Sequence, residues 1–131
     1  MALNVPNAGE KIMLDRIVGN VATGDLEIAL YTNNVTIDDT NVIGDFTEEL
    51  TSTEGGAVDG YVTMDGTWTV VSGDASYPQM TYTYTGAVAA IYGYVVTDGT
   101  VALWAEKFSD GPYVIPTGGG TVKVTPVITL Q

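Results

Sequence analysis

The sequence of 131 residues contains no cysteine and no histidine, and these two absences exclude several kinds of chemistry. Without cysteine the chain has no thiol nucleophile, no thiolate metal ligand and no disulfide bond. Without histidine it lacks the commonest general base and the commonest zinc ligand. Carboxylate chemistry, binding of hard cations through oxygen ligands, and recognition by the protein surface remain open.

Positive charge is scarce as well. Four lysine and arginine residues stand against 16 aspartates and glutamates, which gives a formal net charge of −12. Binding to nucleic acids or to anionic membranes requires clustered basic side chains, because these neutralise phosphates. The basic residues are instead scattered along the chain, as Lys11, Arg16, Lys107 and Lys123. We therefore expect neither nucleic acid nor a membrane among the partners.

Long apolar runs are also missing. No segment reaches the ~18 consecutive apolar residues of a transmembrane helix. The opening segment Met1–Pro6 lacks the basic stretch and apolar run of a secretory signal, so we expect the protein to stay in the cell that makes it. Nevertheless 45% of the residues are hydrophobic, which argues against disorder and predicts one folded domain over residues 1–131.

The chain beyond residue 24 is rich in threonine and valine, whose β-branched side chains favour strands. Alternation of apolar and polar residues predicts eight strands, over residues 25–31, 45–50, 60–64, 67–71, 80–85, 91–97, 101–108 and 121–130. Turn signals separate them, such as Asp98-Gly99, which is typical of a tight hairpin. The pattern therefore predicts an all-β protein, either a sandwich or a barrel.

Two further features bear on the architecture. Ahead of the strands, Asn7 and Glu10 form a capping-box pattern, and we expect an extended arm followed by a helix within residues 1–19. In the predicted hairpin over residues 91–108, both faces carry large apolar side chains. Such strands lie between two layers of one chain or have one face against another subunit.

The carboxylates are the remaining candidates for catalysis or metal binding. Glu48 and Glu49 are adjacent, so on a strand they point to opposite faces and cannot act as a pair. Residues 33–45 are rich in Asn and Asp but lack EF-hand spacing, which favours turn hydrogen bonding over a cation site. We therefore expect no enzymatic activity, no cofactor and no metal.

Aromatic side chains are the candidate binding residues. Tyr82 and Tyr84 share one face of a predicted strand, and Tyr92, Tyr94 and Trp104 lie on the double-apolar hairpin. Together these five rings could stack against sugar rings, which would suit a carbohydrate-binding β-sandwich module. The alternative is that they belong to the hydrophobic core.

Six segments carry a resemblance to known proteins: Met1–Asp15, Leu30–Thr36, Asp45–Glu48, Tyr92–Val96, Leu103–Phe108 and Val124–Leu130. In this order they resemble segments of small virion structural proteins of tailed bacteriophages, common among phages of aquatic bacteria, including cyanophages. These proteins are structural or act as capsid decoration (cement) proteins. The chain departs from their pattern at Ile37, where a proline would follow the threonine.

The resemblance implies a single jelly-roll-like β-sandwich of about eight strands, preceded by the arm and helix. It also implies a decoration protein on the capsid exterior, made in the cytoplasm of the host bacterium, that stabilises the head by bridging capsid subunits. Its partners would be the major capsid protein and further copies of itself, such as a trimer. The alternative is a carbohydrate-binding module of a phage tail or fibre. The acidic composition favours the outside of a particle over a lining that faces packaged DNA.

Overall fold

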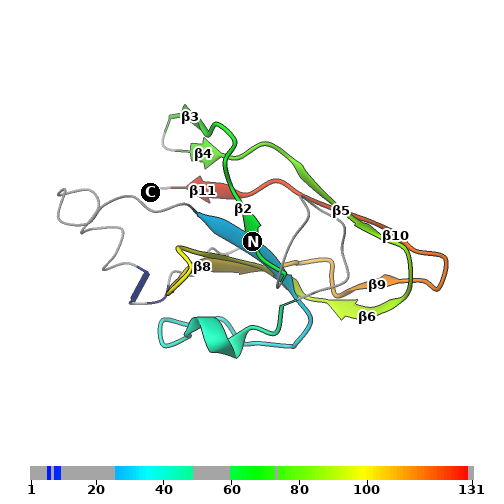
Figure 1. The fold of residues 1–131 in the computed structure, drawn as a ribbon. Helices are drawn as coiled ribbons and strands as arrows, with labels where there is room; N and C mark the ends of the chain where they lie inside the picture. The colour runs from blue at the N-terminus through cyan, green and yellow to red at the C-terminus, as the bar shows by residue number, and fades with distance from the viewer. Residues whose placement is uncertain (1–5, 7, 10–25, 49–59, 73, 130–131) are drawn as a thin grey trace.

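The computed structural model of the chain describes residues 6, 8–9, 26–48, 60–72 and 74–129. Within residues 26–129 the regular elements of this described part are eleven antiparallel strands and one short 3₁₀ helix, η1 (Ile43–Asp45) (Figure 1). The predicted all-β class is therefore confirmed. The predicted arm and helix over residues 1–19 lie outside the described residues, except at Pro6, Ala8 and Gly9.

The largest sheet has four strands in the order β2-β1-β7-β8. Its members are β2 (Val62–Thr63), β1 (Glu27–Tyr31), β7 (Gly93–Thr97) and β8 (Ala102–Lys107). The hairpin β7–β8 contains a bulge at Leu103, because Val96 pairs with Trp104 whereas Thr97 pairs with Ala102. Its turn includes Gly99, which has a φ of +89° and thus a conformation that favours glycine.

The remaining strands form three smaller sheets, in the orders β10-β5, β11-β4-β3 and β6-β9. Their bounds are β3 (Thr69–Val71), β4 (Asp74–Ser76), β5 (Met80–Tyr84), β6 (Val88–Ile91), β9 (Tyr113–Ile115), β10 (Gly120–Val124) and β11 (Val127–Thr129). In Figure 1 the strands β4, β11, β5 and β10 run through the upper part of the molecule and β8 through the lower part.

Residues 74–129 form one long antiparallel ribbon that turns back on itself at the β7–β8 hairpin. The paired strands are nested around that turn, so that β7 pairs with β8, β6 with β9, β5 with β10 and β4 with β11. The partners include Val96 with Trp104, Ile91 with Tyr113, Tyr82 with Val122, and Ala75 with Ile128. The ribbon is folded over, so that successive pairs lie in different sheets.

Three of the predicted strands differ from the structure by more than one or two residues at their ends. The predicted strand 91–97 is interrupted at Tyr92, where the chain leaves the β6-β9 sheet and joins the central sheet. The predicted strand 121–130 ends and restarts around Pro126, which has no backbone N–H for a ladder. Over the predicted strand 45–50, the described residues form the end of η1 and a single bridge between Glu48 and Tyr31. The prediction of a strand there is wrong for the described residues.

The central sheet buries both of its faces within this one chain. One face packs against the smaller sheets in a main core, which includes Ile28, Leu30, Tyr94, Val96, Leu103 and Trp104 of that sheet. The other face packs under the segment of residues 32–48 in a second core, formed by Ala29, Tyr31, Phe46, Val95, Ala102 and Ala105. Of the two arrangements predicted for the double-apolar hairpin, burial between layers of the same chain is the one observed.

Candidate functional site

Four of the five candidate aromatic residues lie in the main core. Tyr82, Tyr84, Tyr94 and Trp104 are between 1% and 3% exposed. Trp104 also packs edge-on against the half-buried Trp68, with ring centroids 6.2 Å apart. The sequence left open a stacking platform or a core, and the structure places these four rings in the core, where no sugar ring can stack on them.

Tyr92 is the fifth candidate, and it lies apart from the other four. Its half-buried ring packs against the second core, and the Nζ atom of Lys107 lies 5.7 Å from the ring centroid. A cation in this position is attracted by the ring quadrupole. The structure therefore does not bring the five predicted rings together on one surface.

Two tyrosine hydroxyl groups meet at Glu106. The Tyr94 hydroxyl donates a hydrogen bond to the Glu106 carboxylate, and the Tyr31 hydroxyl donates one to the Glu106 carbonyl oxygen at 3.4 Å. Burial raises the pKa of both tyrosines far above its usual value, with a further rise from the Glu106 charge for Tyr31 and from the hydrogen bond to Glu106 for Tyr94. Both hydroxyls are therefore protonated at neutral pH and act as donors that hold β8 in place.

Gly93 makes room for the Tyr31 side chain. A Cβ atom at position 93 would lie 2.5 Å from the Tyr31 hydroxyl oxygen and would overlap the Glu106 carbonyl oxygen. Gly93 pairs directly with Tyr31 in the neighbouring strand. The glycine therefore allows the tyrosine ring to lie across the strand, and this constraint was not visible in the sequence pattern.

The Asn- and Asp-rich segment of residues 33–45 uses its side chains to brace turns. Asn33 donates to the carbonyl oxygen of Asp45 at 2.7 Å and accepts from the N–H of Thr47 at 2.8 Å. Asp45 accepts from the N–H of Val42 at 2.9 Å. Hydrogen bonds from Thr40 to the Asp38 carboxylate hold the pKa of that group below its usual value.

The sequence of residues 33–45 is compatible with a cation site, although it favours turn hydrogen bonding. The side-chain oxygens of Asp38, Asn41 and Asp45 accept hydrogen bonds from nearby backbone N–H groups, which is the turn hydrogen bonding that the sequence favoured. Within the described residues no three Asp, Glu, His or Cys side chains converge in a way that could hold a metal ion.

Lys107 fastens the same segment to the central sheet. Its ammonium group donates hydrogen bonds to the Asn34 side-chain oxygen and to the carbonyl oxygen of Val35, the latter at 3.4 Å. Together with the Tyr92 ring, these contacts join β8 to a segment more than seventy residues earlier in the sequence. This cation therefore has a structural role.

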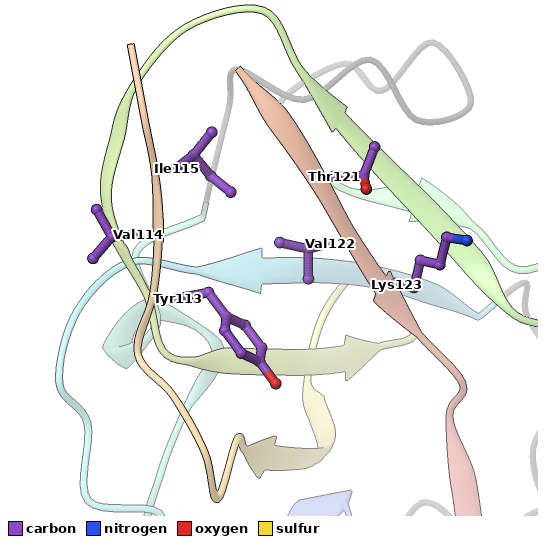
Figure 2. A pocket seen from close by; sticks show the side chains of 6 residues that line it. All are labelled: Tyr113, Val114, Ile115, Thr121, Val122 and Lys123. Carbon is purple, nitrogen blue, oxygen red and sulfur yellow. The ribbon is translucent and has the colours of Figure 1, made fainter. Parts of the chain in front are cut away.

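An open hollow of about 260 Å³ lies between β9 and β10. Figure 2 shows Tyr113, Ile115 and Val122 pointing into the space between the two strands, whereas Thr121 and Lys123 point away on the other side of β10. The Tyr113 hydroxyl donates to the Asp110 carboxylate at 2.5 Å, which raises the pKa of Tyr113. Sequence patterning missed this site, because β9 has three residues and was not predicted as a strand.

Comparisons with known proteins provide no relative for this chain: no family model, curated protein or solved structure matches it. In the part of the chain that the structure describes, no helix has the length and apolar character needed to cross a membrane. The described residues form an all-β fold of antiparallel sheets.

Proposed function

We propose that this chain is a non-enzymatic structural protein of a tailed-bacteriophage virion, a capsid decoration protein that stabilises the head by bridging capsid subunits. It is made in the cytoplasm of the host bacterium and sits on the capsid exterior. Its partners are the major capsid protein and further copies of itself, with a trimer at local threefold positions. The resemblance of six sequence segments to such proteins is the starting point of the proposal.

The finer fold that we propose is a jelly-roll-like sandwich. A jelly roll is made by wrapping an antiparallel ribbon into two layers, and virus capsid proteins are among the proteins that use it. The nested pairing of β4–β11 around the β7–β8 turn supports this topology. Strand β1 departs from a simple wrapped ribbon, since it pairs with β7 in the central sheet.

The observation that carries the proposal is that the apolar residues are packed in the interior whereas the described acidic residues remain at least partly exposed. Both faces of the central sheet are packed inside the chain, and the aromatic residues lie in the two cores. The described acidic residues all remain at least partly exposed, and six of them are exposed: Asp38, Asp39, Asp45, Asp65, Asp74 and Asp110. A body packed in this way resists deformation, and its acidic exterior keeps it soluble before assembly.

A reconstitution experiment tests this function. Particles assembled without the protein are heated in the presence or absence of the purified chain, and release of DNA is followed with a dye that the capsid excludes. We expect the added chain to sediment with the particles and to raise the temperature of DNA release, whereas the heat-denatured chain has no effect. If the native chain neither sediments with the particles nor changes the release temperature, the proposed function is wrong.

A further inference from the structure

The strands beside the hollow each have an unpaired edge. Among the described residues, β9 pairs with β6 and β10 pairs with β5, and neither has a second partner. Every second residue of β10 therefore directs its backbone N–H and C=O groups away from β5, on the side where no described strand pairs with β10. An edge of this kind is a template for another strand, which would supply the missing backbone donors and acceptors.

The hollow next to this edge has a mixed lining, formed by Tyr113, Val114, Ile115, Thr121, Val122 and Lys123. Its inner wall is formed by the Tyr113 ring and by the side chains of Ile115 and Val122, which Figure 2 shows facing the space between the strands. Its volume of about 260 Å³ exceeds that of cavities of roughly 150 Å³ that accept a benzene ring. A phenylalanine, leucine or valine side chain therefore fits the available space.

The outer face of β10 carries a free cation. Lys123 is exposed and forms no hydrogen bond or ion pair with the described residues, whereas Lys107, the other described lysine, is held by Asn34 and Val35. On a chain with a net charge of −12, this lysine is an isolated positive group. It therefore favours a carboxylate on whatever binds beside it.

We propose that the free edge of β10 binds an extended segment of a partner protein by strand addition. Successive side chains of a strand alternate between the two faces. The partner segment therefore places apolar residues in the hollow lined by Tyr113, Ile115 and Val122, and an acidic residue between them beside Lys123. Main-chain hydrogen bonds provide the affinity and the hollow provides the specificity. The inference holds for any partner with this pattern and does not require that the partner be a capsid subunit.

The test uses the full-length chain labelled with ¹⁵N and a synthetic peptide, acetyl-Thr-Val-Glu-Phe-Thr-amide, which has apolar residues on one face and a carboxylate on the other. We expect the peptide to shift the amide resonances of residues 113–115 and 120–124 but not those of 27–31 in β1. An analogue N-methylated at the glutamate and phenylalanine has the same side chains but lacks two backbone donors, and we expect it not to bind.

A charge variant with a matched control tests the contribution of Lys123. Lys123→Gln and Thr69→Glu each make the chain more negative by one charge, and both positions are exposed, so both variants should fold. We expect Lys123→Gln to weaken peptide binding by about two- to fivefold, as for a surface ion pair, and Thr69→Glu to leave it unchanged. The proposal is overturned if the peptide shifts no resonance at millimolar concentration, if the shifts map elsewhere, if the N-methylated analogue binds equally well, or if both variants bind alike.

Discussion

At the scale of single residues, several side chains have roles that their type alone does not reveal. Gly93 is needed because Tyr31 and the Glu106 backbone occupy the space a Cβ atom would take. Lys107 connects β8 to residues 34–35, whereas Lys123 forms no hydrogen bond or ion pair with the described residues. Such roles depend on which strands become neighbours, and a sequence pattern contains no information about a contact between residues seventy positions apart.

Replacement of Gly93 by alanine should destabilise the protein by about 2 kcal/mol or more, because the added methyl group forces Tyr31 and the β8 backbone apart. Gly86 is the matched control, since a Cβ atom there meets nothing within 4 Å. Gly86→Ala should therefore change the free energy of unfolding by less than about 1 kcal/mol. Urea unfolding followed by tryptophan fluorescence measures both, and equal effects of the two substitutions would contradict the close packing at Gly93.

Replacement of Lys107 by glutamine should lower the free energy of unfolding by about 1 kcal/mol, because the contacts with Asn34, Val35 and Tyr92 are lost or weakened. Lys123→Gln removes the same charge from an exposed position and should be close to neutral. Chemical denaturation of the two variants side by side gives the comparison. A loss of stability for Lys123→Gln as large as that for Lys107→Gln would mean that net charge, and not the Lys107 contacts, sets the effect.

The buried tyrosines make stability sensitive to alkaline pH. Burial raises the pKa of Tyr61 to about 12, with smaller contributions from Glu48 and Glu27, and it raises the pKa of Tyr31 and Tyr94 further still. In the unfolded chain these groups ionise near pH 10. The folded state then holds protons that the unfolded state has lost, so the tyrosine contribution to stability is constant below about pH 10 and falls as the pH rises above it.

The slope above pH 10 should approach about 1.4 kcal/mol per pH unit for each of the fully buried residues Tyr31 and Tyr94. Urea unfolding between pH 8 and 11.5 measures it, and tyrosinate absorbance recorded in parallel shows which hydroxyls ionise while the chain is folded. Tyr94→Phe should reduce the slope. A stability that does not change over this range, with all tyrosines ionising in the folded protein, would contradict the burial.

At the scale of elements, the sequence predicted the strands in which apolar and polar residues alternate clearly, and it missed strands without a clear alternation. The ranges predicted for β1, β5 and β8 differ from the structure by two residues or fewer at each end, because each has a continuous apolar face. Strands β4 and β9 have three residues each, too few for a period to be recognised. The switch between sheets at Tyr92 was also missed, because alternation continues unchanged through it. The sequence identified the five candidate aromatic residues. It could not show which of them are buried, because burial depends on how the sheets pack against one another.

The segment of residues 32–48 should behave as a fixed cover of the central sheet. Phe46 is 3% exposed and packs edge-on against Tyr31, with ring centroids 5.2 Å apart. Phe46→Ala should therefore lower the free energy of unfolding by about 3 kcal/mol or more. Val42 in the same segment is 56% exposed, and Val42→Ala should be almost neutral. Thermal unfolding measures the stability of the Phe46→Ala and Val42→Ala variants. If Phe46→Ala unfolds at the same temperature as the unsubstituted protein, the segment does not cover the sheet.

At the scale of the whole molecule, a long folded ribbon of strands β4–β11 and the three earlier strands β1, β2 and β3 form an all-β body that buries apolar surface on both sides of a central sheet. The large excess of acidic residues argues against nucleic acids and anionic membranes as partners. In the structure, the described carboxylates line the exterior and brace turns. The described part of the chain therefore combines a packed apolar interior with an acidic exterior, and this combination supports the proposal that the protein stays free before it assembles.

The central claim, that this chain decorates the outside of a phage head, is tested most directly by a cryo-electron microscopy map of the virion that encodes it. The account predicts β-rich density with the size of a 13.8 kDa chain on the outer surface of the capsid, at positions shared by neighbouring subunits and accounted for by the fold described above. A capsid surface without such density, or density for this chain found inside the shell against the DNA, would contradict it.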